Sequence, residues 1–92
     1  MDLTVNYERT NGKEEAYKAV KEAITPELLE KFQVKATLDY RDNEILANGK
    51  GFDLLMAFDE NSCDVKVTLS FLLKPLKGKV LSSIEKQLKR VI

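Results

Sequence analysis

The chain has 92 residues, of which 43% are hydrophobic and 33% are charged, and its 15 basic residues balance its 15 acidic ones. A chain of this length builds one hydrophobic core, so we expect a single domain over residues 1–92. The composition excludes a disordered protein, and no apolar stretch approaches the roughly 20 residues of a membrane-spanning helix. The first ten residues lack the basic and apolar regions of a secretory signal, so we expect none, and the sole cysteine, Cys63, excludes an internal disulfide. We therefore expect a cytoplasmic protein.

Positive charge is concentrated at the end of the sequence. Residues 72–92 contain six lysines or arginines and one glutamate, whereas residues 1–71 contain nine basic and 14 acidic residues. This asymmetry indicates either an anionic partner or a basic helix that lies beside an acidic body in the same molecule.

The first third of the chain predicts one strand followed by two helices. Residues 3–8, LTVNYE, alternate apolar and polar side chains, as a strand with one buried face does. Asn11 and Glu14 have the spacing of a capping box, which predicts a helix over about 12–24. A Thr-Pro-Glu sequence then indicates the start of a second helix, over residues 26–32.

The middle of the chain predicts four further strands joined by short turns. Alternating patterns cover residues 34–40, 44–47, 51–58 and 63–71. An Asn-Gly pair at 48–49 predicts a two-residue type I′ turn, because both residue types tolerate a positive φ. Consecutive strands with such short connections form an antiparallel meander.

One face of this meander is rich in large apolar side chains. The last strand is the clearest example, with Cys63, Val65, Val67, Leu69 and Phe71 on the inward side. The first helix offers only a narrow, alanine-rich apolar stripe. The meander therefore requires a second cover.

The closing segment is expected to be that cover. Its apolar residues recur every fourth position, on one side of a helix over residues 76–92. These residues are Leu76, Val80, Ile84, Leu88 and Ile92. A glycine inside this helix, Gly78, costs about 1 kcal/mol relative to alanine, which indicates a close backbone contact there. The expected architecture is α+β, in the order β-αα-ββββ-α, with a curved antiparallel sheet packed on a long C-terminal helix.

The side chains give little support for catalysis, so we expect no enzyme, no cofactor and no metal site. The chain has no histidine, which excludes imidazole chemistry. Cys63 lies in the inward phase of a strand, where a thiol acts as a small buried residue. Asp39, Asp53 and Asp64 fall on the outer side of the sheet beside lysines, as on an ordinary solvated face. The aromatic residues fall on inward strand phases, which speaks against nucleic-acid binding.

One pattern extends through most of the chain. The chain begins with a strand and a helical segment, EEAYKAV, and continues with GFDLLMAFDENSCDVKVTLSFLLKPLKGKVLSSIEKQL. Within this second segment, the strand that ends in LSFLL is followed by a lysine-rich turn, KPLKGKV, and then by the last helix, which contains IEKQL. This pattern resembles the polyhydroxyalkanoic acid system protein family of small bacterial proteins. The element order also resembles a shortened helix-grip domain, in which a curved sheet wraps a long helix.

The resemblance implies a non-enzymatic protein associated with storage-polyester granules, a granule protein, or another hydrophobic or anionic surface. The contacts are expected from the basic residues of the last segment, which are Lys74, Lys77, Lys79, Lys86, Lys89 and Arg90. One alternative is a carrier of small hydrophobic ligands, whose cavity would be lined by Phe52, Met56, Phe58, Val67 and Ile84. Another is a protein-partner module, such as a homodimer formed at the edge of the last strand.

Overall fold

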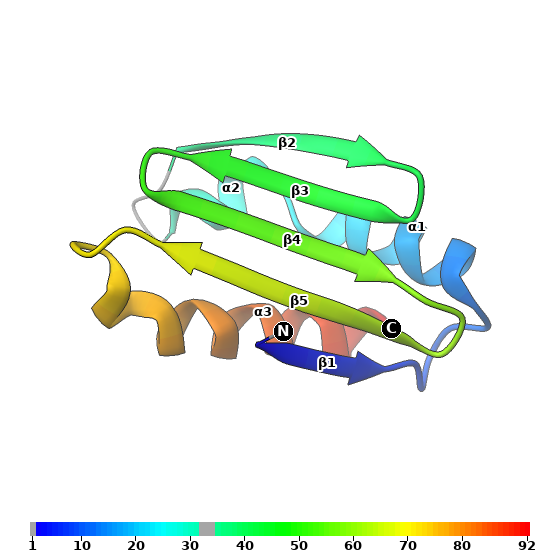
Figure 1. The fold of residues 1–92 in the computed structure, drawn as a ribbon. Coiled ribbons are helices and arrows are strands. Elements are labelled where there is room, and N and C mark those ends of the chain that lie inside the picture. The colour runs from blue at the N-terminus through cyan, green and yellow to red at the C-terminus, as the bar shows by residue number, and fades with distance from the viewer. Residues whose placement is uncertain (1, 32–34) are drawn as a thin grey trace.

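The computed structural model describes residues 2–31 and 35–92, which form two layers, a five-stranded sheet and the helices behind it (Figure 1). The strands are β1 (Leu3–Asn6), β2 (Ala36–Arg41), β3 (Glu44–Gly49), β4 (Phe52–Phe58) and β5 (Ser62–Leu69). The helices are α1 (Lys13–Ala23), α2 (Pro26–Glu30), the short 3-10 helix η1 (Lys74–Leu76) and α3 (Lys77–Val91). The predicted α+β class and the order of its elements are confirmed.

Neighbouring strands of the sheet run antiparallel, in the order β1-β5-β4-β3-β2. The predicted meander from β2 to β5 is confirmed, and β1 joins it by pairing with β5, with Leu3 opposite Val65. β5 is therefore an inner strand, and β1 and β2 form the edges. β1 already pairs with Ser62–Val65, the first half of β5, and the expected homodimer at the edge of the last strand stays a prediction.

The helices cover one face of the sheet and leave the other face uncovered (Figure 1). α1 and α3 pack against each other, and α1 contributes the fully buried Ala16 and Val20. The expected cover by the closing helix is confirmed, because its apolar side is at most 1% exposed. This side consists of Val80, Ile84, Leu88 and Ile92. We call the uncovered side of β2 to β5 the open face. The helix-grip comparison stays a prediction.

The two central hairpins each turn through two residues. β2 and β3 are joined by Asp42–Asn43, where Asn43 has a φ of 62°. β3 and β4 are joined by Lys50–Gly51, where Gly51 has a φ of 74°. The prediction of a type I′ turn at 48–49 is wrong, because the register that buries the apolar side of β4 keeps those two residues paired.

β5 ends two residues earlier than predicted. Leu69 is the last residue opposite β4, because it pairs with Phe52 and the chain before Phe52 turns away into β3. Phe71, which the alternation places on the inward side, is 85% exposed. The alternating pattern thus continues past the point where a partner strand exists.

The start of the closing helix also differs from the prediction. Residues 74–76 form η1, and α3 begins at Lys77. Leu76 consequently lies outside α3 and is 37% exposed, so it does not belong to the buried side of the helix. A Cβ added at Gly78 would meet no atom within 4 Å, so the expected close backbone contact at this glycine is wrong.

The first two helices are confirmed with shorter bounds. Gly12 is the N-cap of α1, with a φ of 100°, and no side chain of the described residues caps this helix, so the Asn11 capping box does not form. Thr25 caps α2 as the sequence indicates, because its Oγ1 accepts a hydrogen bond from Leu28 N at 3.3 Å. The predicted end of the second helix and the start of the next strand fall on residues 32–34, outside the described residues.

Asp2 fastens the start of the chain to both β5 and α3. Val67 N donates a hydrogen bond to Asp2 Oδ2 at 2.8 Å, and Lys77 Nζ lies 3.1 Å from Asp2 Oδ1. The hydrogen bond from Val67, followed by the contact with Lys77, lowers the pKa of Asp2 below its usual 3.8. The first turn of α3 is therefore held beside the β1–β5 pair.

The segment after β1 closes the C-terminal end of α3. The carbonyl oxygen of Ile92 accepts hydrogen bonds from Glu8 N and Arg9 N, both at 2.7 Å. Arg9 Nε donates a further hydrogen bond to the Lys89 carbonyl oxygen at 2.9 Å. These contacts satisfy carbonyl groups that a helix end leaves unpaired, and they place a cation at the negative end of the helix dipole.

Candidate surface-binding site

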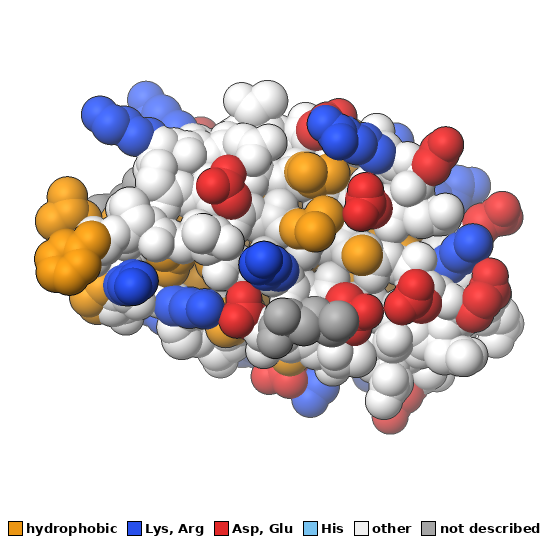
Figure 2. Space-filling view, in the orientation of Figure 1, with side chains coloured by type: hydrophobic (Ala, Val, Ile, Leu, Met, Phe, Trp, Pro, Cys, Tyr) orange, Lys and Arg blue, Asp and Glu red, His pale blue; other side chains and the backbone are white. Residues whose placement is uncertain are grey.

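Two large apolar side chains project from the end of the molecule where β5 stops. Phe71 and Leu72 are each 85% exposed, the highest exposure among the large hydrophobic residues that the structure describes. Figure 2 shows an apolar projection at the left end of the molecule, the end to which β5 points in Figure 1. We call Phe71 and Leu72 the apolar tip.

A tight turn presents this tip. Ser70 N donates a hydrogen bond to the Gly51 carbonyl oxygen at 2.8 Å, and the Ser70 carbonyl oxygen accepts from Leu73 N and Lys74 N at 2.9 and 3.0 Å. Leu73 is partly buried and packs on the core. The residues on both sides of the tip are therefore tied to the body of the protein, and only the tip is left outside.

Gly51 is required for this arrangement for two reasons. Its φ of 74° is favourable for glycine, and a Cβ at this position would lie 2.7 Å from Ser70 Oγ. The β3–β4 turn therefore approaches the tip segment more closely than any residue with a side chain could.

Five lysines lie at the same end of the sheet as the apolar tip. One precedes β2, one lies in the β3–β4 turn, one opens η1 and two lie in the first turn of α3. These are Lys35, Lys50, Lys74, Lys77 and Lys79, which we call the basic end. Lys77 pairs with Asp2, whereas the other four make no ion pair within the described part of the chain. The tip therefore projects from a surface of uncompensated positive charge.

The structure spreads the six predicted basic contacts along η1 and α3. Lys74, Lys77 and Lys79 lie near the tip, whereas Lys86, Lys89 and Arg90 lie in the other half of the helix. At about 1.5 Å per residue, Lys79 and Arg90 are about 16 Å apart along the axis. Lys89 also pairs with Glu85 at 3.4 Å. The first three are the ones that the fold places beside exposed apolar side chains.

The residues proposed to line a ligand cavity all belong to the buried core. They are Phe52, Met56, Phe58, Val67 and Ile84. The surface grooves that the structure shows are lined by other residues. A cavity between the sheet and the helix stays a prediction.

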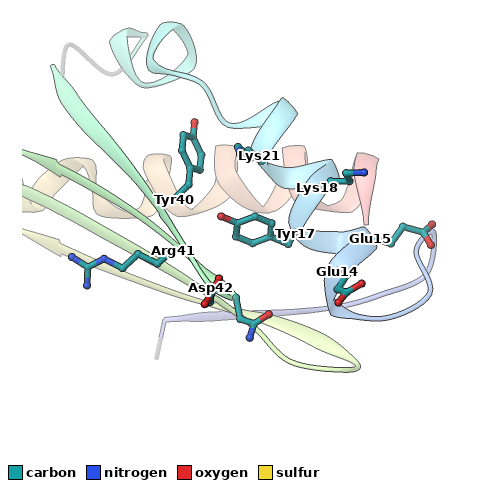
Figure 3. Close-up of a pocket in the computed structure, with 9 residues that line it drawn as sticks. Glu14, Glu15, Tyr17, Lys18, Lys21, Tyr40, Arg41 and Asp42 are labelled. Carbon is teal, nitrogen blue, oxygen red and sulfur yellow. The ribbon is translucent and has the colours of Figure 1, made fainter.

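The largest of these grooves, about 670 Å³, lies between α1 and the β2–β3 turn (Figure 3). Tyr17 makes an edge-to-face contact with Phe58, with 5.5 Å between ring centroids, and Lys21 Nζ lies 4.9 Å from the centre of the Tyr40 ring. Figure 3 shows Lys18 and Arg41 pointing away from the two tyrosines. The polar groups of this groove therefore do not converge on one ligand position.

Three of the groups considered for catalysis, Cys63, Asp39 and Asp64, are buried or already paired. Cys63 is fully buried, and burial, with nearby carboxylates adding to it, raises the pKa of its thiol to about 12. Asp39 pairs with Arg41 at 2.8 Å, and Asp64 accepts a hydrogen bond from Thr4 Oγ1 at 2.9 Å. Across residues 2–31 and 35–92, no cluster of three carboxylate or thiol groups is placed to hold a metal ion.

Sequence reasoning identified the lysine-rich turn but missed the apolar tip beside it. The available signal was the turn itself, because the apolar pair stands directly before a Lys-Pro sequence. An unpaired residue next to such a turn has no partner strand to bury it.

Comparison with protein families gives one finding. The family described as "Putative polyhydroxyalkanoic acid system protein" matches residues 3–92. No curated protein and no solved structure matches the chain. None of the helices in the described residues is long and apolar enough to cross a membrane.

Proposed function

This chain belongs to the polyhydroxyalkanoic acid system protein family, and from that premise we propose that it is a non-enzymatic protein that binds the surface of storage-polyester granules. The observation that carries the proposal is the apolar tip, which is 85% exposed at both residues and lies within the basic end. A granule presents an apolar polymer and a partly anionic surface. The tip and the lysines complement these two properties.

The tip supplies the apolar part of the binding free energy. Transfer of a large aliphatic or aromatic side chain out of water is worth about 1.5–3 kcal/mol. Phe71 and Leu72 together therefore provide roughly 3–6 kcal/mol for insertion into an apolar surface. Phe71 and Leu72 are adjacent and form one exposed apolar patch, and such patches are found at interaction sites.

The lysines supply the electrostatic part. Each lysine near an anionic surface contributes about 1 kcal/mol, and the contribution falls off within a Debye length. Lys74 is two residues from the tip, and Lys50 lies in the turn that contacts Ser70. Binding is therefore expected to be reversible and weaker at high salt.

Fractionation of granules tests the proposal. Purified protein is mixed with isolated granules at low salt, the granules are sedimented, and the bound fraction is measured. We expect the wild type to sediment with the granules and the Phe71→Ser/Leu72→Ser variant to stay in solution. Tyr40→Ser, which removes an exposed aromatic ring outside the tip, is the matched control and is expected to bind as the wild type does.

Two outcomes contradict different parts of the proposal. A wild-type protein that stays soluble beside granules at low salt overturns granule binding. A double variant that sediments as strongly as the wild type leaves granule binding in place and overturns the role of the tip.

A further inference from the structure

The open face carries an ordered pattern of side chains. The antiparallel register aligns outward residues of β5, β4, β3 and β2 in three rows across the sheet. These rows are Asp64–Ala57–Glu44–Arg41, Lys66–Leu55–Leu46–Asp39 and Thr68–Asp53–Asn48–Thr37. The middle row has an apolar centre with opposite charges at its two ends.

The centre of this face is apolar and has no cover. Leu46 and Leu55 are partly exposed on the side away from the helices. Figure 2 shows a small group of apolar side chains in the middle of the face, bordered by acidic and basic ones. A partner for this face must therefore present an apolar centre and the opposite order of charges.

We propose that a second copy of this chain binds the open face, related by a two-fold axis that runs parallel to the strands between β3 and β4. This rotation reverses the order of residues in every row. In the middle row it places Lys66 opposite Asp39 of the second copy, and Leu55 opposite Leu46. In the first row it places Arg41 opposite Asp64.

The remaining positions are compatible with this arrangement. In the third row the rotation places Thr68 opposite Thr37 and Asp53 opposite Asn48, so each pair includes a hydrogen-bond donor. In the first row Glu44 faces the small Ala57, which leaves space for its carboxylate. No position in the three rows meets a like charge.

The charges also select this axis over the other two-fold arrangement. An axis that runs across the strands, along the middle row, would place each residue of that row opposite its own copy. Lys66 would then face Lys66, and Asp39 would face Asp39, which is unfavourable for both pairs. The pattern therefore specifies the orientation as well as the partner.

Arg41 can serve both copies. Its Nε lies 2.8 Å from Asp39 Oδ2, and its side chain is 61% exposed. The two terminal nitrogens of a guanidinium group remain as donors for a second carboxylate. The internal pair thus holds Arg41 beside Asp39 along β2, at the edge of the open face.

The resulting dimer is a sandwich with helices on both outer sides. Packed sheets lie about 10 Å apart. Four strands at about 4.8 Å spacing and six to eight residues in length give a contact face of roughly 15–20 Å by 20 Å, which is smaller than the interfaces of stable complexes and in the range of weak, transient ones. We expect a reversible dimer, and this inference does not depend on granule binding.

Sedimentation velocity over a concentration series tests the dimer. We expect the wild type to approach twice the chain mass of 10.5 kDa as concentration rises. Lys66→Asp alone, or Asp39→Lys alone, places like charges opposite each other twice per dimer and is expected to shift the protein to the monomer. The double variant Lys66→Asp/Asp39→Lys restores complementarity and is expected to dimerise again.

Two further variants make the outcome decisive. Lys86→Asp makes the same charge change on α3, away from the open face, and is expected to leave the dimer intact. The double variant Arg41→Asp/Asp64→Arg repeats the charge exchange on the neighbouring row. It keeps the proposal testable if the first exchange impairs folding, and circular dichroism monitors the folding of every variant. A wild type that is monomeric at all concentrations overturns the proposal, as does a dimer that is insensitive to the single exchanges or not restored by both double variants.

Discussion

The two ends of the sheet differ in how they use their side chains. At one end lie the apolar tip and the basic end, where two large apolar groups and four lysines have no partner within the described residues. At the other end, Tyr7 Oη lies 2.7 Å from the Asp59 carbonyl oxygen, and Lys13 Nζ lies 3.6 Å from Glu60. At this end, the segment after β1 also donates hydrogen bonds to carbonyl oxygens at the C-terminal end of α3. We call this second end, residues 7–13, 59–62 and 88–92, the closed end.

This difference separates stability from binding. Groups of the closed end satisfy backbone carbonyls and bury apolar surface, so substitutions there are expected to act on the free energy of unfolding. Groups at the apolar tip contribute little to the folded state because water already surrounds them. Substitutions at the tip are therefore expected to act on surface binding alone.

The largest contrast is expected from one chemical change made at both ends. Leu88→Ala removes a fully buried side chain and is expected to lower the free energy of unfolding by about 2–5 kcal/mol. Leu72→Ala at the tip is expected to change it by less than about 0.5 kcal/mol. Urea unfolding of both variants measures the difference, and similar losses would show that the tip packs on the body.

A second contrast concerns the basic residues of η1 and α3. Lys74→Gln/Lys79→Gln removes two charges near the tip and is expected to weaken granule binding by about 2 kcal/mol, or roughly 30-fold. Lys86→Gln/Arg90→Gln removes two charges from the other half of the helix and is expected to have a smaller effect. Binding isotherms at low salt compare the pairs, and equal losses would indicate that the whole helix contacts the surface.

A smaller effect is expected from one hydroxyl group at the closed end. Tyr7→Phe removes the group that contacts the Asp59 and Ser62 carbonyl oxygens and is expected to cost about 1 kcal/mol, or about 4–8 °C in Tm. Burial raises the pKa of Tyr7, so this hydroxyl stays protonated at neutral pH. Tyr40→Phe, at an exposed tyrosine, is the control and is expected to leave Tm nearly unchanged.

The smallest effect is expected from Asp2 and depends on pH. Its folded-state pKa lies below the usual 3.8, so the carboxylate stabilises the fold above that pH, and this contribution is lost as the pH falls through the folded-state pKa. Asp2→Asn lacks the contribution at every pH. The urea midpoints of wild type and variant should therefore converge as the pH falls below about 4, and a difference that stays constant through this range would show that the effect does not come from the charge of Asp2.

Most of the fold could be predicted because local pattern and tertiary packing agree. The alternation of β4 and β5 and the four-residue spacing of α3 each mark one buried side, and the structure buries those sides against each other. The pairing of β1 with β5 could not be predicted in this way. It joins Leu3 to Val65, and no local pattern specifies which distant strand an edge strand selects.

The apolar tip could not be predicted for a similar reason. Alternation predicts that Phe71 is buried, but burial in a sheet also requires a neighbouring strand of equal length. The turn at Gly51 ends that neighbour at Phe52, and the length of β5 is therefore set by residues about twenty positions earlier. Most of the predicted basic residues are exposed, as charged side chains usually are, but Lys77 is half-buried and pairs with Asp2, and the predicted surface contacts stay a prediction.

The position of β1 has a consequence for how the chain folds. The hairpins from β2 to β5 join residues that are close in sequence, so they can form early at small cost in chain entropy. β1 must instead find β5 about sixty residues away, and Arg9 reaches Lys89 across 80 positions. We expect the meander to form first and β1 to join last, together with the closure of α3. Folding is then complete only when both distant ends of the chain are present.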